Sequence, residues 1–270
     1  MSVSPIVKKD FQDAIRSRWL LGLTALFVGL VSLAAYIVRP APGQTVSSNS
    51  ILQIINQVFV GILVPLIALV ISYNAITGER ESGSLKLLLA LPHSRADLVV
   101  GKVIGRVGAL TVPLLVGFIL PAVVLAVGPL EFQAVTYLGY VLAVCLLGAV
   151  YVAIAVGLSA AVATQRLAIT GAILLYFLFV PLWDAVQFPL QIWLSGGTPV
   201  WLPLTLEELL RLLELINPNG AFGFIADGLL TGGLYQGQGA RLEISATLML
   251  VTWLIALPLL GVVSFENQDL

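Results

Sequence analysis

The sequence has little of the chemistry that enzymes and metalloproteins use. It contains one cysteine, Cys145, and one histidine, His93, in 270 residues. A single cysteine excludes an internal disulfide framework and a cysteine-based metal cage. The two methionines, Met1 and Met249, are too few for a path that carries a soft metal. We therefore expect a chain that is not an enzyme and holds no metal or cofactor of its own.

Charge is also scarce. Only 10% of the residues are charged and 59% are hydrophobic, whereas soluble domains carry about 25% charged residues. Such a chain cannot cover a globule with charge, so the lipid bilayer is its expected solvent. The net charge of −1 gives no reason to expect a nucleic-acid partner. Spans and loops use the whole length, so we expect one membrane domain over residues 1–270.

Apolar stretches then predict the fold. A membrane-spanning helix needs roughly 20 mainly apolar residues, and several windows meet this requirement. They are residues 19–38, 54–76, 104–127, 136–160, 167–188 and 244–264. The sequence therefore predicts an all-α membrane protein with six transmembrane helices.

The basic residues predict the orientation of these helices. With a cytoplasmic N-terminus, ten of the 13 lysines and arginines fall in cytoplasmic segments. The three on the outer side are Arg39, Arg211 and Arg241. Positive charge is enriched in cytoplasmic loops of membrane proteins. We therefore expect a multi-pass protein of the plasma membrane, surrounded by lipid, with both termini in the cytoplasm.

Residues 1–18 have the pattern of an interfacial amphipathic helix. Ser4-Pro5 is a favourable start, because serine caps helices and proline suits the first turn. One face is apolar and the other is charged. The apolar face holds Val7, Phe11, Ala14, Ile15 and Trp19, and the charged face holds Lys8, Lys9, Asp10, Asp13 and Arg16. Such a helix lies in the plane of the lipid headgroups, either as a simple anchoring flank or as a moving part.

The longest loop, residues 189–243, is predicted to lie outside and to be helical. Residues 204–216 are amphipathic, and the sequence Asn217-Pro218-Asn219-Gly220 ends that helix. A second apolar piece follows over 221–230. Neither piece is long enough to span a membrane, so we expect them to form an outer cap. At the end of span five, Asp184 and Trp183 predict a position in the aromatic belt at the outer surface.

The most informative segment is residues 77–102, a charged stretch between spans two and three. Gly83 breaks the helix, Ser84 can begin a short one and Pro92 ends it. Ser94 with Asp97 forms the pattern of a capping box for the next helix. The result is an elbow on the cytoplasmic side. Its leucines are too apolar for a solvated loop, so they dock on a partner or tuck under the membrane domain.

These residues carry a family resemblance. The stretch ERESGSLKLLLALPHSRADLVVGK resembles the corresponding elbow of ABC-2 type transporter permeases, with Ser84 where threonine is common. The basic N-terminal helix, the six spans and the large last outer loop are similar too. INPNGAF, residues 216–222, resembles a motif of the subgroup that includes the permeases of nitrous-oxide-reductase maturation systems.

The resemblance implies a function. Such a permease forms a homodimer, and each copy docks an ABC ATPase subunit that binds ATP and Mg²⁺, so that ATP hydrolysis drives export. An accessory protein that delivers the substrate is a further implied partner. Phe11 and Arg16 would lie on a second cytoplasmic lever. The implied coupling residues are Glu79, Arg80, Glu81, Gly83, Ser84, Leu85, Leu91, Pro92, Ser94 and Arg95.

Two motifs suggest other functions and fail. Residues 96–103 nearly match a phosphate-binding loop, but Val103 stands where the magnesium-binding serine or threonine belongs. Ser159 in span four suggests an intramembrane serine protease, yet the lone His93 is outside the bilayer and cannot activate it. We expect Ser159 to be a small packing residue, in a span rich in small side chains that suit close helix contacts. Cys145 is expected to be a buried apolar residue.

Polar residues within spans are costly and rare. Gln53, Asn56 and Gln57 share one helical face at the outer start of span two. They are candidates for a substrate path, or they sit at the interface with water. Two functions remain as hypotheses: the permease of an ATP-driven exporter, and a membrane scaffold or assembly factor for a metalloenzyme that moves no solute.

Overall fold

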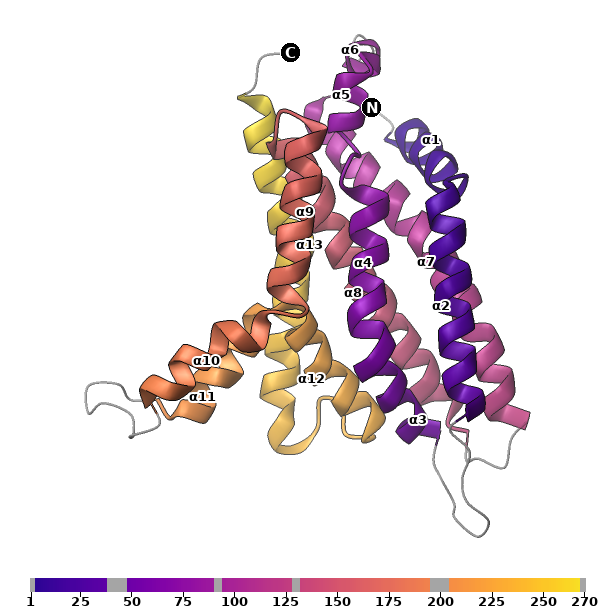
Figure 1. Ribbon diagram of the computed structural model, residues 1–270, viewed down its shortest axis with the longest axis vertical. Coiled ribbons are helices and arrows are strands. Elements are labelled where there is room, and N and C mark those ends of the chain that lie inside the picture. Colours follow the sequence, from indigo (N-terminus) through magenta and orange to yellow (C-terminus); the bar gives the residue numbers. More distant parts are fainter. Residues whose placement is uncertain (1–2, 38–47, 90–93, 128–131, 195–203, 268–270) are drawn as a thin grey trace.

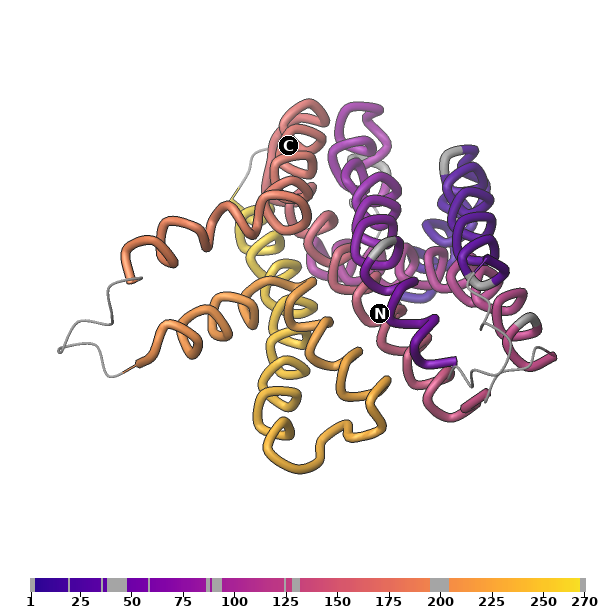
Figure 2. The backbone as a smooth tube through the Cα atoms, turned by 60° about the horizontal axis from the view of Figure 1, so that its bottom comes forward, coloured from indigo at the N-terminus to yellow at the C-terminus, as the bar shows by residue number. Residues whose placement is uncertain are grey.

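The computed structural model describes residues 3–37, 48–89, 94–127, 132–194 and 204–267, and within these ranges every regular element is a helix. The helices form an elongated bundle (Figures 1 and 2). In chain order they are α1 (Ser4–Ile15), α2 (Arg18–Ile37), α3 (Ser48–Ile55), a π-helical turn (Asn56–Val60), α4 (Gly61–Ser72), α5 (Thr77–Glu81), α6 (Ser84–Leu89), α7 (Arg95–Val127), α8 (Ala134–Ala161), α9 (Gln165–Phe179), α10 (Trp183–Leu194), α11 (Leu206–Ile216), α12 (Pro218–Leu230), a short 3₁₀ turn (Gly237–Gly239) and α13 (Ala240–Glu266).

The bundle has two distinct ends. The helices α1, α5 and α6 and the C-terminal end of α13 lie together at one end, called here the elbow end (Figure 1). The helices α3, α10, α11 and α12 lie at the opposite end, called here the loop end (Figure 1). Both ends of the described chain are therefore on the same side of the bundle, as an even number of crossings requires.

In the described residues, four helical stretches are long and apolar enough to cross a membrane. They are Gly61–Glu81, Arg95–Val127, Ala134–Ala161 and Gly237–Glu266. Two bent pairs raise this number to six if each pair is one span: Ser4–Ile15 with Leu20–Ala34, bent by 65°, and Gln165–Phe179 with Trp183–Leu194, bent by 47°. The multi-pass, all-helical prediction is confirmed. The continuous helix expected over 167–188 is not found, because the chain bends at Val180-Pro181.

The helix α8 is the centre of the bundle and packs against α4, α7, α12 and α13. Small residues allow this close packing. A Cβ atom on Gly148 would come within 2.8 Å of Leu110, and one on Gly261 would come within 2.6 Å of the carbonyl oxygen of Gly157. The small residues of span four therefore do bring helices together, and Cys145 between them is half-buried rather than fully buried.

Large apolar side chains cover the outside of the bundle. On α7, α8 and α13 the exposed ones include Ile119, Val123, Leu138, Leu248 and Leu260. A soluble monomer rarely exposes such a continuous apolar surface, and lipid is its natural environment. Trp183 is an exception among the expected lipid-facing residues. Its side chain is only 8% exposed and packs on Phe179 with 5.9 Å between ring centroids, so its expected place in the aromatic belt is wrong.

The predicted helical outer loop has two parts. The helix α12 packs against α8 and α13, whereas α10 and α11 extend sideways from the bundle (Figure 1). The start of α11 is a capping box, in which Thr205 Oγ1 accepts from the Glu208 backbone N–H and Glu208 Oε2 accepts from the Thr205 N–H. The Thr205 backbone N–H and the Thr205 hydroxyl both donate to Glu208 Oε2, and they lower the pKa of Glu208 because they stabilise the ionised carboxylate.

Candidate functional site: the elbow end

A cluster of charges, buried or partly buried except for the exposed Lys9, joins three helices at the elbow end. It consists of Lys9 and Asp10 on α1, Glu79 on α5, and Lys102 and Arg106 on α7, and is called here the charge cluster. Lys102 Nζ lies 3.1 Å from Asp10 Oδ1 and 3.0 Å from Glu79 Oε1. Lys9 Nζ contacts the same Glu79 oxygen at 2.9 Å, and Arg106 Nε lies 2.7 Å from Asp10 Oδ2.

Burial makes these ion pairs strong constraints. The side chains of Lys102 and Asp10 are 3% and 4% exposed, and Arg106 also donates to the backbone carbonyl of Ile71 at the end of α4. Removing one partner of a buried pair leaves an uncompensated charge and typically costs about 3–5 kcal/mol. The cluster therefore holds α1, α4, α5 and α7 together as one unit.

The placement of Asp10 corrects the prediction for α1. The sequence pattern puts Asp10 on the charged, water-facing side, but the buried residues of α1 are Ile6, Asp10 and Ala14. This face lies on α7 rather than on lipid. Helical periodicity cannot reveal a buried charge, because the compensating lysine and arginine are more than 90 residues away.

Glycines on α7 make this contact possible. A Cβ on Gly101 would lie 2.7 Å from Ile6 Cγ2, and one on Gly105 would lie 3.0 Å from Asp10 Cβ and from the Val7 carbonyl oxygen. The two glycines are four residues apart and so share one face of α7. This face is a groove for the backbone of α1, and it brings Asp10 within reach of Lys102 and Arg106.

Ser159 holds the start of the elbow from the other side. Its hydroxyl oxygen accepts hydrogen bonds from the backbone N–H groups of Ile76 and Thr77, both at 3.1 Å. Both N–H groups are at the start of α5, where no intrahelical acceptor is available. Ser159 is fully buried. It is therefore more than the packing residue expected from the sequence, since it acts as a helix cap supplied by α8.

Three charged residues of the elbow, Arg80, Glu81 and Arg95, contact their own chain. Arg80 donates to the Val162 carbonyl at 2.9 Å, and Glu81 accepts from the Gln165 N–H at 2.7 Å. Arg95 lies over the Phe265 ring at 5.0 Å and also donates to the carbonyl of that residue. The elbow is thus tied to the α8–α9 turn and to the end of α13.

Part of the described elbow is open to its surroundings. Glu81, Ser82, Gly83 and Ser94 are exposed, whereas Leu85 is 2% exposed and lies in the core. Gly83 has φ of 75°, a left-handed conformation that glycine adopts without strain, and it separates α5 from α6. Ser94 and Asp97 form the expected capping box, with both hydrogen bonds at 3.0 Å. Leu91 and Pro92 lie outside the described residues.

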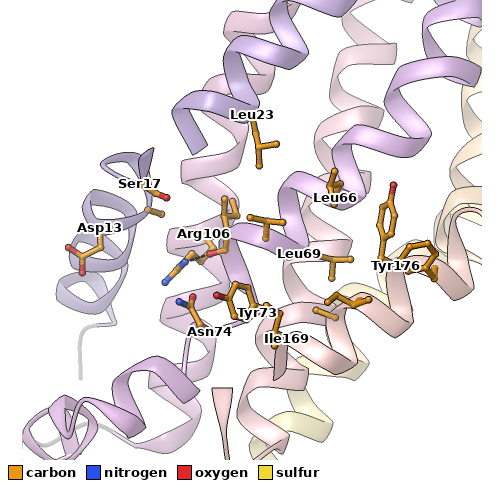
Figure 3. A pocket seen from close by; sticks show the side chains of 16 residues that line it. Asp13, Ser17, Leu23, Leu66, Leu69, Tyr73, Asn74, Arg106, Ile169 and Tyr176 are labelled. Atoms are coloured by element: carbon orange, nitrogen blue, oxygen red, sulfur yellow. Dashed lines mark hydrogen bonds between the residues drawn. The ribbon is translucent and has the colours of Figure 1, made fainter. Parts of the chain in front are cut away.

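A cavity of about 780 Å³ opens beside the charge cluster (Figure 3). Its wall is apolar and includes Leu66, Leu69 and Ile173 from α4 and α9. Its polar groups gather towards the elbow end, where Asp13 and Arg106 lie. In Figure 3, Asp13 and Ser17 stand on one side of the cavity and Tyr176 on the opposite side. The site can therefore accept an apolar body with a polar end.

A second cavity of about 320 Å³ lies nearer the loop end and is lined by Gln57, Asn219 and Tyr176, among others. The three polar residues of span two, Gln53, Asn56 and Gln57, have different surroundings here. Gln57 is exposed and lines this cavity, whereas Asn56 accepts a hydrogen bond from the Tyr140 hydroxyl at 3.2 Å. Gln53 is half-buried and lines neither cavity. The π-helical turn that begins at Asn56 shifts the helical phase, so the expected single face is not kept.

The outer motif has a structural explanation. Pro65 has no N–H group, so the Gly61 carbonyl four residues earlier loses its helical partner. Asn219 Nδ2 donates to that carbonyl at 2.8 Å, and the Tyr151 hydroxyl donates to Asn219 Oδ1 at 3.1 Å. Asn217 Nδ2 donates to the Phe179 carbonyl at 2.9 Å, at the end of α9. Asn217 and Asn219, where α11 meets α12, thus connect this helical pair to α4, α8 and α9.

Comparison with known proteins identifies the family. A family model described as "ABC-2 family transporter protein" matches residues 4–270. The chain belongs to the ABC-2 transporter family. This confirms the resemblance on which the functional prediction depends, and it makes this chain a membrane subunit of an ABC system.

Two curated relatives extend the comparison over most of this permease. A probable ABC transporter permease protein NosY of Stutzerimonas stutzeri is 32% identical over 268 residues, covering 95% of this chain and 93% of the relative. A protein of the same name from Pseudomonas aeruginosa is 35% identical over 234 residues, covering 83% and 84%. Both names describe a permease, in agreement with the subgroup resemblance.

Sequence reasoning missed several residues that the permease uses at its elbow end. The sequence places Lys102 in the charged elbow and Lys102 and Arg106 on the helix that leads into span three, but it gives no sign that both pair with Asp10. The repeated Gly101, Gly105 and Gly108 spacing was an available signal for a closely packed helix. Of the expected second lever, Phe11 is half-buried and its ring would lie 3.2 Å from a Cβ on Gly108, whereas Arg16 is exposed.

Proposed function

We propose that this chain is the permease subunit of an ATP-driven ABC exporter, which couples ATP hydrolysis by a separate ATPase subunit to translocation of a solute. ATP and Mg²⁺ would be bound by that partner. The family supports this proposal, and the relatives' names favour transport over a scaffold that moves no solute. We place the elbow end in the cytoplasm, where ten of the 13 basic residues then lie.

The observation that carries the proposal is the way the elbow is anchored. A segment that receives force from a partner needs an open contact surface and stiff connections to the helices that must move. Among the described residues of the elbow, the open surface includes Glu81, Ser82, Gly83 and Ser94. The stiff connections are the charge cluster, the Ser159 cap and the Arg80 and Arg95 contacts. A push on α5 and α6 is thereby transmitted to α1, α7, α8 and α13.

The two cavities supply a route for the solute. The larger one lies between α2, α4 and α9 and contains a polar end near Arg106. The smaller one contains Gln57 at the loop end. We propose that the solute enters the larger cavity from the elbow end and that a second copy of the chain closes its open side, in a homodimer. An accessory protein would meet the complex at the loop end.

Coupling to the ATPase is tested at Gly83. Proline has φ near −65°, so Gly83→Pro cannot keep the φ of 75° that separates α5 from α6. We expect the tagged full chain to co-purify with an ATPase subunit, and we expect Gly83→Pro to abolish the stimulation of ATP hydrolysis that the permease causes in proteoliposomes. Normal ATPase binding and turnover with Gly83→Pro would show that the elbow is not the coupling element.

A second variant tests the buried connection. Glu79→Gln keeps the size of the side chain and removes its charge from the cluster, so ATP hydrolysis should lose its coupling while the ATPase still binds. Glu207→Gln is the matched control, because Glu207 is 74% exposed and its ion pair among the described residues is with Arg211 on its own helix. Equal effects of the two variants would argue against a special role for the charge cluster.

A further inference from the structure

The two cavities lie in series along the seam between α4 and α9. Along α4 and the turns at its two ends, the lining residues run from Asn74 and Leu66 in the larger cavity to Ile62 and Gln57 in the smaller one. The order on α9 is opposite because the helices are antiparallel. Residues 169–177 line the larger cavity and residues 176–181 line the smaller one. Both helices thus pass from one cavity to the other at the same level.

Tyr176 is the one residue described that lines both cavities. Its side chain is half-buried, and its hydroxyl donates to the Ile62 carbonyl across the seam at 3.5 Å. This hydrogen bond is at the weak limit of such contacts, so breaking it costs little. The ring of Phe177 packs edge-on against it at 5.7 Å between centroids. The ring is therefore held by apolar packing on Phe177 and the core, and it can move without breaking a strong hydrogen bond.

Both helices are interrupted next to this ring. On the α4 side, the π-helical turn Asn56–Val60 and Pro65 flank Gly61 and Ile62. On the α9 side, the helix ends at Phe179, and α10 continues at an angle of 47° to it. π-helical turns and proline are the usual sites of helix bending. Both α4 and α9 therefore have a site where the helix can bend within a few residues of the contact between Tyr176 and Ile62.

The polar groups that line the two cavities are separated by an apolar region around Tyr176. The elbow-end cavity has Asp13, Asn74 and Arg106, and the loop-end cavity has Gln57 and Asn219. Between them the described lining is apolar apart from Tyr176, with Leu66, Leu69 and Ile173. An aromatic ring within an apolar stretch, between two regions with polar groups, is placed where it can limit the passage of water and polar solutes.

We propose that Tyr176 is the gate between the two cavities. It closes the seam by its contact with Ile62 and opens when α4 and α9 bend at their interruptions. This inference rests on the proposed transport function, because a gate matters only where a solute passes. Its test measures access to the seam, needs neither ATP nor the partner, and so can fail separately from the coupling test.

The test is site-directed thiol labelling in the full-length chain. Cys145→Ala removes the single cysteine, and Gln57→Cys or Asn74→Cys then places one thiol on either side of Tyr176. The probe is a membrane-impermeant methanethiosulfonate reagent, added to the elbow side of sealed inverted membrane vesicles. With Tyr176 present, the Asn74→Cys protein should react and the Gln57→Cys protein should be protected. Rapid reaction of the latter would overturn the proposal.

Removal of the ring should remove the protection. Tyr176→Ala in the Gln57→Cys protein is expected to react from the elbow side, whereas Phe177→Ala, the neighbouring ring that lines only the larger cavity, should leave the protection intact. An unchanged Asn74→Cys rate in the Tyr176→Ala background checks that the protein still folds. If that rate changes, Tyr176→Leu replaces Tyr176→Ala, because leucine keeps apolar bulk without the ring. Protection that survives loss of Tyr176, or is lost equally with Phe177→Ala, would contradict the gate.

Discussion

Asp10 shows how one residue can hold several helices in place. Its carboxylate accepts from Lys102 on one oxygen and from Arg106 on the other, and it is almost completely removed from water. Burying a carboxylate is expensive unless its charge and hydrogen bonds are compensated. Both conditions are met here by residues of α7. The position of α1 is thereby specified by chemistry rather than by apolar packing alone.

We predict that Asp10→Asn destabilises the permease by about 3–5 kcal/mol, because it removes the carboxylate that pairs with Arg106 and leaves Lys102 with Glu79 alone among the described carboxylates. The measurement is the thermal unfolding midpoint of the detergent-purified protein. Asp13→Asn on the same helix is the control, since Asp13 is exposed and surface changes usually stay within about 0.5 kcal/mol.

A compensating variant sharpens this test. Adding Lys102→Met to Asp10→Asn removes one of the stranded charges and should recover part of the lost stability, since apolar replacements of buried ion pairs are often tolerated. A double variant no more stable than Asp10→Asn alone, or an equal loss with Asp13→Asn, would show that the carboxylate matters for another reason.

Among the elements, the contact between α1 and α7 is the one most sensitive to side-chain size. Gly101 and Gly105 leave a groove in which the backbone of α1 lies against α7, with Ile6, Val7 and Asp10 directly over the missing Cβ atoms. An interior glycine normally costs a helix about 1 kcal/mol relative to alanine. The close approach of α1 offsets that cost.

Gly105→Ala is expected to reverse the usual benefit of alanine in a helix. The added methyl would press on the backbone of α1, and such overpacking costs about 1–3 kcal/mol. It should lower the unfolding midpoint and speed tryptic cleavage at Lys8 and Lys9. The matched control is Gly22→Ala on α2, where a Cβ meets nothing within 4 Å. A destabilisation of equal size at Gly22 would contradict the groove.

At the scale of the whole molecule, the elbow end and the loop end are connected through α4. Arg106 bonds to the last turn of α4, and Asn219 bonds to its first residue, Gly61. The helix continues towards α5 through a short turn held by Ser159. A displacement at either end of the bundle therefore acts on the same helix, which also forms one wall of both cavities.

The orientation of the molecule gives a separate prediction. In the Cys145→Ala background, Ser82→Cys at the elbow end should react with an impermeant thiol reagent only after the cells are permeabilised. Gln236→Cys at the loop end should react in intact cells, because we place that end outside. Ser82 and Gln236 are both exposed. The opposite labelling pattern would invert the proposed topology without affecting the fold.

Much of this architecture follows from local sequence patterns. The apolar windows predict the long helices because the backbone N–H and C=O groups of a segment in lipid have no water to bond with. A helix satisfies them by hydrogen bonds within the segment. Gly83, the Ser94–Asp97 box and the Asn217-Pro218 stop are determined by neighbours within a few positions, so they can be inferred from the chain itself. The same is true of the family resemblance, which rests on a continuous stretch of the elbow.

The tertiary structure alone decides the features that join distant residues. The burial of Asp10 depends on Lys102 and Arg106, the cap on α5 depends on Ser159, and the carbonyl freed by Pro65 is satisfied by Asn219. The bend after Phe179 and the seam at Tyr176 likewise depend on how α4 and α9 pack. Composition predicted a membrane protein with few charges, but only the fold shows that several of these scarce charges are buried together, where pairing makes them structural.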